Sequence, residues 1–434
     1  MPDTDQPNPE AAHEPFRPHD PYAALREPNF RWFLAGNMLS LLGLQMQTFA
    51  VTWEIYDRTR SNLALAWVGL VQVVPVILLF LPAGHLIDRM DRRRVLIAAL
   101  GVAMFSSLGL AFSSANKADV VWSYLFLFFI GTARAFLQPA RAALLPQILP
   151  RSLFSSAVTW NSGGFQLAMV TGPTLGGLVI GLLKDATPVY LINALVALSY
   201  AFCLSMIRIP PFTPPIEAPS LRSLAAGIGF VWRTKVILGA LTLDMFAVLL
   251  GGATALLPVY AREILDVDPT KLGWMRAAPG VGALMMSIFL THRPPLAHAG
   301  RALLWAVAGF GVATVIFGFS RSFSLSLAML FVMGTLDMIS VVVRQTLVQL
   351  LTPDAMRGRV SAINSLFIGI SNELGEFESG SVAALFDSPA DRAVGPTVSV
   401  VSGGFGTILV VATAAFLWPE LRKYGRLDGP QQNS

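Results

Sequence analysis

Long apolar stretches recur through the whole of this 434-residue chain, and they constrain its fold more than any other feature. About 20 apolar residues in a helix cross the hydrocarbon core of a bilayer. In lipid the peptide groups must be satisfied within the segment, which favours helices. We find twelve such stretches, at residues 31–55, 63–87, 94–114, 121–146, 154–183, 187–208, 237–261, 272–291, 301–320, 324–350, 359–386 and 395–418. The sequence therefore predicts an all-α membrane protein with twelve transmembrane helices.

Too few residues lie outside the twelve spans, and too few side chains in the chain are charged, for a large domain outside the membrane. Only 13% of the side chains are charged, against about 25% in a soluble domain. We expect a disordered cytoplasmic tail, an N-terminal six-helix bundle, a cytoplasmic linker, a C-terminal six-helix bundle and a second cytoplasmic tail, at 1–28, 29–208, 209–236, 237–420 and 421–434. Because the tail at 1–28 has no apolar run, we expect no signal peptide, and the first span stays in the protein.

The linker at 209–236 begins with several prolines and then becomes amphipathic. Ser220 is placed to cap a short helix that carries Leu221, Ile228 and Trp232 on one face. We expect a helix at the membrane surface. The alternative is that this segment only extends the seventh span.

Basic residues indicate how the chain is oriented. If the N-terminus is cytoplasmic, the segments on that side contain more than twice as many Lys and Arg residues as the segments on the other side. Cytoplasmic loops carry this excess in membrane proteins. We therefore expect both termini in the cytoplasm of a plasma membrane or cell inner membrane. The basic excess then reports topology, and we expect no nucleic-acid partner.

Several kinds of chemistry are excluded by what the sequence lacks. The single cysteine, Cys203, excludes an intrachain disulfide and a cysteine-based metal cluster. No phosphate-binding G-x-x-x-x-G-K-[ST] motif and no H-E-x-x-H zinc motif occurs. The five histidines lie in the first tail or at expected cytoplasmic loops, so a proton relay in the membrane would need carboxylates. We expect no enzyme activity, no metal and no cofactor.

The chain contains an internal repeat. A shift of 203 residues aligns 127–177 with 330–380 without a gap, and it places Arg141, Pro150 and Asn161 on Arg344, Pro353 and Asn364. A duplicated unit of six helices gives two parallel repeats, because each copy starts on the same side of the membrane. In such transporters the substrate site lies near the membrane midplane, between the repeats.

The loop after the second span carries a recognisable motif. Residues 84–94 read GHLIDRMDRRR, which resembles the G-x-x-x-D-R-x-G-R-R signature of the major facilitator superfamily, with Asp91 in place of glycine. The Arg141–Pro150 region and the Arg344–Asn364 stretch resemble the enterobactin-exporter-like branch. The resemblance implies a secondary transporter that works by alternating access, and it implies export. The gating residues that it selects are Gly84, Asp88, Arg89, Asp91, Arg92 and Arg93.

Asp88 is the main gating candidate. The resemblance implies that its carboxylate accepts hydrogen bonds from the free amides at the start of the eleventh span, and so latches the cytoplasmic side. Arg89, Arg92 and Arg93 would supply charge to this latch, and Gly84 would allow a close helix approach. The alternative is a basic loop that only sets topology.

Ionisable residues within the spans are the candidates for substrate or proton handling. A charge in the middle of a membrane helix costs about 2.5–3.5 kcal/mol on insertion scales, so each needs a partner or a wet cavity. The candidates are Arg134, Asp244, Asp337, Arg344, Glu373 and Glu376, with Asn37, Gln45, Thr48 and Thr52 as a polar stripe on the first span. Structural networks between helices, or simple helix packing for the stripe, are the alternatives.

These observations together predict a proton-coupled exporter of a small amphipathic molecule, such as a siderophore or a drug-like compound. Asp337 and Glu373 are the favoured proton carriers, because both lie near the expected midplane. We expect protons, membrane lipids and a small-molecule substrate as partners, and a monomer. The alternatives are a nutrient importer or uniporter of the same fold, or a membrane receptor that transports nothing.

Overall fold

The computed structural model describes residues 22–150, 153–208, 221–293, 298–388 and 390–425, and these residues are almost entirely helical. The first half contains η1 (Ala23–Arg26), α1 (Pro28–Thr59), α2 (Asn62–Arg89), α3 (Arg92–Ala115), α4 (Val120–Ile148), α5 (Phe154–Leu183) and α6 (Thr187–Met206). The second half contains α7 (Leu221–Arg233), α8 (Lys235–Leu250), η3 (Ala253–Leu256), α9 (Leu257–Val259), η4 (Tyr260–Ile264), α10 (Pro269–Thr291), α11 (Ala299–Phe319), α12 (Phe323–Leu351), α13 (Asp354–Leu385), α14 (Val394–Leu417) and α15 (Pro419–Lys423). The predicted helical fold class is confirmed.

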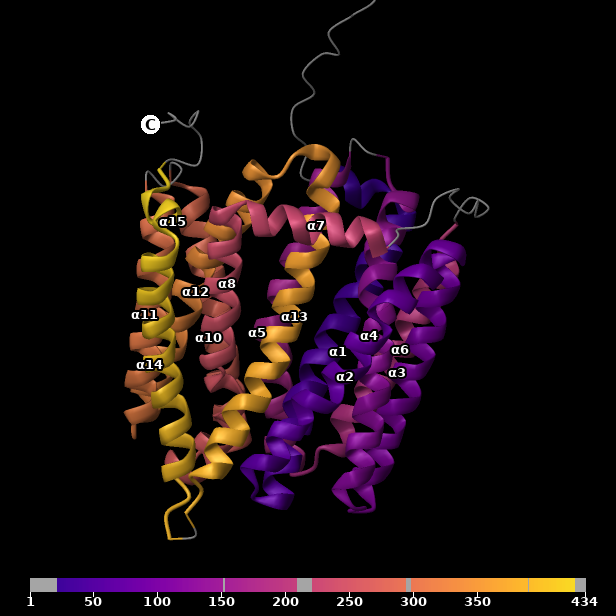
Figure 1. Cartoon of the computed structure of the whole chain (residues 1–434). Helices are drawn as coiled ribbons and strands as arrows, with labels where there is room; N and C mark the ends of the chain where they lie inside the picture. The colour runs from indigo at the N-terminus through magenta and orange to yellow at the C-terminus, as the bar shows by residue number, and fades with distance from the viewer. Residues whose placement is uncertain (1–21, 151–152, 209–220, 294–297, 389, 426–434) are drawn as a thin grey trace, which may run out of the picture.

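The long helices stand side by side, and the described ends of the chain lie on one face, which we call the terminal face (Figure 1). On this face Asn29, at the start of α1, donates to the carbonyl of Arg208, at 3.0 Å. The backbone N–H of Ala299 donates to the carbonyl of Gly425, also on this face, at 3.1 Å. The other end of the bundle is called the opposite face below.

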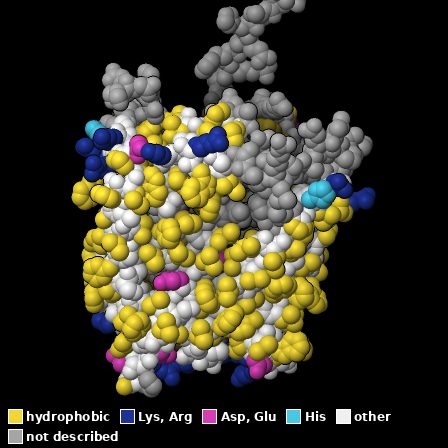
Figure 2. All heavy atoms as spheres, viewed as in Figure 1, with side chains coloured by type: hydrophobic (Ala, Val, Ile, Leu, Met, Phe, Trp, Pro, Cys, Tyr) yellow, Lys and Arg dark blue, Asp and Glu magenta, His cyan; other side chains and the backbone are white. Residues whose placement is uncertain are grey.

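The sides of the bundle are apolar, while Lys, Arg, Asp and Glu gather toward its two ends (Figure 2). Leu182, Trp305 and Phe416 are 72%, 78% and 83% exposed, which suits contact with lipid tails. Nine described helical segments are long and apolar enough to cross a membrane. The helices α1, α10 and α13 are more polar. All three make contacts between the two halves of the molecule.

The two halves repeat the same packing. In the first half α1 packs on α5 and α6, α3 packs on α4 and α6, and α2 packs on α4. In the second half α8 packs on α13 and α14, α11 packs on α12 and α14, and α10 packs on α12. Each of these pairs is related to its counterpart by the repeat seen in the sequence. The halves join where α5 packs on α10 and where α2 packs on α13.

The seventh span, predicted at 237–261, matches a membrane-length apolar segment at Lys235–Ile264, which is not one regular α-helix. The helix α8 ends at Leu250, and η3, α9 and the π-helical η4 continue the segment. Gly252 lies at the break, where a Cβ would be 2.6 Å from the carbonyl oxygen of Gly375 and from the hydroxyl of Ser379. The close approach of α13 thus requires glycine at the point where α8 ends and η3 begins.

The linker contains a separate helix, α7, which lies across the terminal face (Figure 1). Thr234 separates α7 from α8, so the alternative of one extended seventh span is wrong. Val231 is buried on α7, while Ile228 and Trp232 are exposed. The predicted cap, Ser220, lies outside the described residues.

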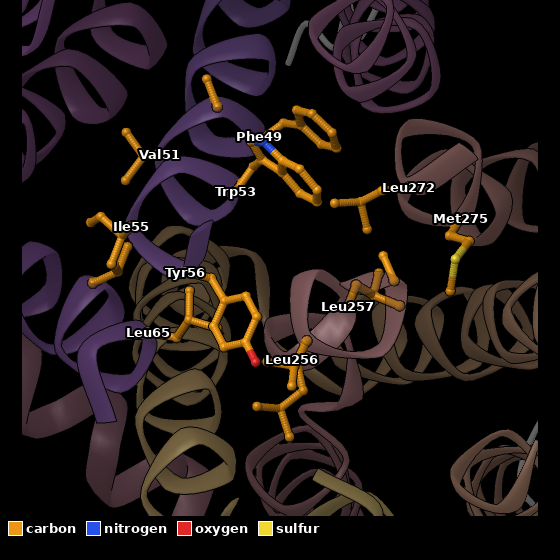
Figure 3. Close-up of a cluster of buried hydrophobic side chains, with 14 of the residues drawn as sticks. Phe49, Val51, Trp53, Ile55, Tyr56, Leu65, Leu256, Leu257, Leu272 and Met275 are labelled. Carbon is orange, nitrogen blue, oxygen red and sulfur yellow. The ribbon is translucent and has the colours of Figure 1, made fainter. Parts of the chain in front are cut away.

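A single hydrophobic cluster joins the halves near the opposite face (Figure 3). From the first half, Phe49, Trp53 and Tyr56 of α1 enter it, and from the second half Leu257 and Leu272 do so. Each of these side chains is at most 7% exposed. Burial of a large apolar side chain contributes about 1.5–3 kcal/mol relative to exposure to water. The cluster therefore closes this end of the molecule.

Candidate functional site

Charged and polar side chains also join the two halves at the opposite face. Glu263 of η4 accepts hydrogen bonds from the Tyr56 hydroxyl and from Arg60 Nη1, both at 3.0 Å. Arg262 Nη2 lies 3.3 Å from Asp57 Oδ1. Because each contact pairs a residue near the end of α1 with one near the end of η4, these bonds act as a latch across the halves. We call these five residues the opposite-face latch.

Between this latch and the middle of the bundle, small residues let the helices of the two halves approach closely. A Cβ at Gly69 of α2 would lie 2.9 Å from the carbonyl oxygen of Glu373 on α13. A Cβ at Gly177 of α5 would lie 3.1 Å from the Cα of Gly273 on α10. Larger side chains at these two glycines would force the halves apart.

Glycines of the same helices nearer the terminal face make no such close contact. Among the residues that the structure describes, nothing lies within 4 Å of a Cβ placed at Gly84 of α2, Gly163 of α5 or Gly369 of α13. The halves are thus in contact over the part of the molecule away from the termini. The conformation is one that is closed at the opposite face.

An ion pair crosses between the halves at the level of the α2–α13 contact. Arg134 Nη1 on α4 donates to Glu373 Oε1 on α13 at 2.7 Å, and it lies 3.4 Å from Gln72 Oε1 on α2. The two charged side chains are 31% and 14% exposed. Both residues were selected from the sequence, which did not show that they pair.

A second ion pair lies beside the first but within one half. Arg276 Nη2 on α10 is 4.0 Å from Glu376 Oε1 on α13, and Arg276 Nη1 donates to the carbonyl of Thr254 at 3.3 Å. Glu376 packs against α2, because its carboxylate would be 3.5 Å from a Cβ at Gly69. Two arginines and two glutamates thus form a charge-balanced cluster at the seam between the halves.

A third pair is buried inside the second half. Arg344 of α12 forms an ion pair and hydrogen bond with Asp244 of α8, and both side chains are at most 7% exposed. Asp337, two turns earlier on α12, has no ion-pair or hydrogen-bond partner among the described residues. Arg344 therefore uses an acid from another helix, since the spacing from Asp337 is unfavourable for direct pairing.

The four polar residues of the stripe predicted on α1 divide into two groups. Asn37 donates to Asn161 of α5 at 3.1 Å, and Gln45 donates to the sulfur of Met169, also on α5. The hydroxyls of Thr48 and Thr52 donate hydrogen bonds to backbone carbonyls of α1 itself. The threonines thus satisfy their own helix, while Asn37 and Gln45 connect α1 to α5.

Two residues of the loop motif hold the first half together. Asp91 Oδ1 caps α3 by accepting from the backbone N–H of Arg93 at 2.9 Å, which is the role of an aspartate N-cap. Arg93 donates to the carbonyls of Ser205 and Ile207 at the end of α6, at 2.9 and 3.0 Å. In this conformation Arg93 thus binds the end of α6, and its expected contribution to the latch of Asp88 stays a prediction.

The proposed latch of Asp88 stays a prediction. The side chains of Asp88 and of residues 357–359, where the eleventh span begins, lie outside the described residues. Arg89 is exposed and Arg92 is partly buried. Among the described residues nothing lies within 4 Å of a Cβ placed at Gly84, so the close helix approach expected there stays a prediction.

Sequence analysis did not select several residues that the structure brings to the seam. Arg276 carried a usable signal, since it is a charge within the span 272–291, as Arg134 is within its own span. Tyr56 and Glu263 carried no such signal, because polar residues are ordinary at the ends of spans. Only the packing of the halves brings these two residues together.

Comparisons with known proteins agree with this arrangement. A family profile described as "Transmembrane secretion effector" matches residues 19–413. The chain belongs to this family of the major facilitator superfamily. It is therefore a multi-pass membrane transporter of small molecules and not an enzyme.

Curated relatives of this family cover almost the whole chain. The multidrug efflux pump Tap of Mycolicibacterium fortuitum is 25% identical over 418 residues, which cover 91% of this chain and 95% of that protein. The enterobactin exporter EntS of Escherichia coli (strain SMS-3-5 / SECEC) is 24% identical over 412 residues, which cover 94% of this chain and 95% of that protein.

Solved structures share the fold. A bacterial homologue of the iron transporter ferroportin in an inward-facing state matches with a TM-score of 0.70 at 17% identity, covering 92% of this chain and 99% of that one. A bacterial homologue of the lysosomal transporter Spinster, inward-facing and occupied, matches with a TM-score of 0.70 at 14% identity, covering 94% and 98%. The predicted superfamily fold is confirmed.

Proposed function

We propose that this protein exports a small amphipathic organic molecule, such as a siderophore or a drug-like compound, in exchange for protons. The names of two relatives, an efflux pump and an exporter, support export. In this proposal the transporter is a monomer in the inner or plasma membrane, and the bundles at 29–208 and 237–420 rock about the linker at 209–236. The terminal face is cytoplasmic, so the conformation is closed toward the outside.

The observation that carries the proposal is the Arg134–Glu373 pair, because it joins the two halves. Opening the opposite face must separate α2 from α13, and Glu373 lies at that contact. The Arg276–Glu376 and Arg344–Asp244 pairs lie within the second half and move with it as a unit. Of the three pairs, the one between Arg134 and Glu373 is therefore the pair that rocking breaks.

This difference couples protonation of Glu373 to the change of conformation. With Arg134 beside it, the carboxylate is stabilised as an anion. Once the opposite face opens, Glu373 loses this cation, and a carboxylate in a medium of low dielectric then favours the protonated form. A proton enters from outside while the substrate leaves, and it is released to the cytoplasm when Arg134 pairs with Glu373 again. Asp337 is the second candidate, since its carboxylate has no partner within the described part of the chain.

The test compares Glu373→Gln with Glu376→Gln in everted vesicles that contain the full-length protein. Accumulation of a fluorescent amphipathic dye is driven by an acid-inside pH gradient. We expect Glu373→Gln to abolish accumulation against a gradient but to retain downhill exchange, because the amide imitates a permanently protonated acid. Glu376→Gln should retain accumulation, since its partner Arg276 belongs to the same half.

The proposed role of Glu373 fails if Glu373→Gln accumulates dye to the wild-type level with the same pH dependence. Asp337→Asn is measured in parallel. A loss of uphill transport in Asp337→Asn alone would move the coupling site from Glu373 at the seam to Asp337 on α12.

A further inference from the structure

Among the described residues, Arg141 of α4 is paired with no acid. Its Nη2 donates to the hydroxyl of Ser40 on α1 at 2.9 Å, and its guanidinium carbon lies 5.4 Å from the centre of the Tyr200 ring. Its Nε is buried and makes no hydrogen bond, and no carboxylate lies within ion-pair distance in the part of the chain that the structure describes. A cation taken out of water without an anion is costly, because its charge is not compensated.

In the second half, the arginine at the equivalent position has its charge neutralised by an acid. Arg344, the repeat counterpart of Arg141, pairs with Asp244 on α8, and α8 is the counterpart of α1. Ser40 thus provides a hydroxyl where the other half provides a carboxylate. The repeat has kept the arginine in both halves and the acid in only one.

Arg141 lies on nearly the same side of α4 as Arg134, but its side chain contacts α1 and α6 of its own half. It is seven residues from Arg134, which places it about 20° around the helix and about 10 Å along it. Arg134 reaches across to Glu373 of the other half. Arg141 is therefore nearer the terminal face, where the halves separate, and its side chain is only partly buried.

Two hydroxyl groups lie beside Arg141, those of Ser40 and Tyr200. The Tyr200 hydroxyl is buried, and its ring lies under the Arg141 guanidinium. An anionic group bound to Arg141 would supply the missing charge and would find hydroxyl donors beside it.

We propose that Arg141 binds the anionic group, a carboxylate or a sulfonate, of an amphipathic organic anion carried by this transporter. The assignment of that anion as transported substrate rests on the proposed export function. The binding itself can be measured without transport. The same chemistry would suit the phosphate of an anionic lipid, and the experiment separates the two sources.

The experiment uses two dyes that share one ring system and differ in a sulfonate, 1-anilinonaphthalene-8-sulfonate and neutral N-phenyl-1-naphthylamine. Equilibrium binding to the full-length protein in phosphatidylcholine nanodiscs is followed by energy transfer from its tryptophans. Ser40→Asp is the decisive variant, because it recreates beside Arg141 the pair that Arg344 makes with Asp244. Ser40→Asn is the matched control of equal size without charge.

We expect the wild type and Ser40→Asn to prefer the sulfonate dye over the neutral dye by about tenfold or more, the change that corresponds to one charged hydrogen bond. Ser40→Asp should lose this preference while binding the neutral dye normally, which also shows that it is folded. Arg141→Gln should lose it as well. An equal preference in Ser40→Asp and the wild type would refute the assignment and would make Arg141 a packing residue.

Two further arms complete the test. If phosphatidylglycerol in the nanodisc displaces the sulfonate dye from the wild type but not from Arg141→Gln, the bound anion is a lipid phosphate and the substrate assignment is overturned. If the dye preference holds but vesicles show no proton-driven transport of either dye, the export proposal fails and anion binding by Arg141 stands. These results separate a failure of the site from a failure of the function.

Discussion

Glu263 offers the sharpest perturbation of the opposite-face latch, because it receives bonds from two residues of the other half. We expect Glu263→Gln to shift the protein toward the state open at that face. The change removes the Arg60 ion pair, whose side chains are 32% and 18% exposed and which is worth about 0.2–1 kcal/mol after screening. It also weakens the Tyr56 bond from a charged to a neutral acceptor, at a cost of about 1 kcal/mol.

The sum, about 1–2 kcal/mol, corresponds to a population of the open state that is about 5–30 times larger. Cys203 is the only cysteine, so Cys203→Ser gives a background free of thiols. Leu272→Cys then places one thiol in the hydrophobic cluster that closes this end, where Leu272 is 1% exposed. An impermeant maleimide added from the opposite face labels this thiol only when the cluster opens, so the labelling rate should rise by the same factor.

Glu54→Gln is the matched control. Glu54 also accepts from a tyrosine hydroxyl, that of Tyr190 at 2.7 Å, and pairs with Arg58 at 3.4 Å, but all three residues belong to the first half. Its replacement should leave the labelling rate unchanged, because no contact between the halves is lost. Equal labelling rates in Glu263→Gln and the parent, or equal acceleration by both variants, would refute the latch.

Three further outcomes are expected. A reporter fused to the C-terminus should be active only in its cytoplasmic form, and Lys184 should be labelled from outside; activity of a periplasmic reporter would contradict the topology. Asp88→Asn should express normally but transport poorly, as measured by dye accumulation. Transport by this variant at the wild-type rate would show that the loop only sets the topology. Asp244→Asn should lower the melting temperature strongly, because breaking a buried pair costs about 3–5 kcal/mol; Arg344→Met combined with Asp244→Leu should recover most of that loss, and no recovery would show that the pair does more than neutralise charge.

The sequence alone was sufficient for the helices, their approximate ends and the duplication. Hydropathy along one segment decides whether that segment can lie in lipid, and this property does not depend on its neighbours. The repeat could be read because Arg141 and Arg344, or Asn161 and Asn364, keep one register. The same local signal also selected Arg134 and Glu373, since a charge in an apolar stretch is conspicuous wherever its partner lies.

The tertiary structure decided which charges meet. Arg134 and Glu373 are 239 residues apart and pair because α2 packs on α13 beside α4, which no local pattern encodes. The seventh span departs from a regular α-helix after Leu250, where α13 approaches Gly252 closely, although its hydropathy suits a continuous helix. The contact at Gly69 and the open space at Gly84 occur on one helix, and they differ because α2 meets α13 closely at Gly69 only. Hydropathy is a property of a segment, whereas pairing and conformation are properties of how segments pack.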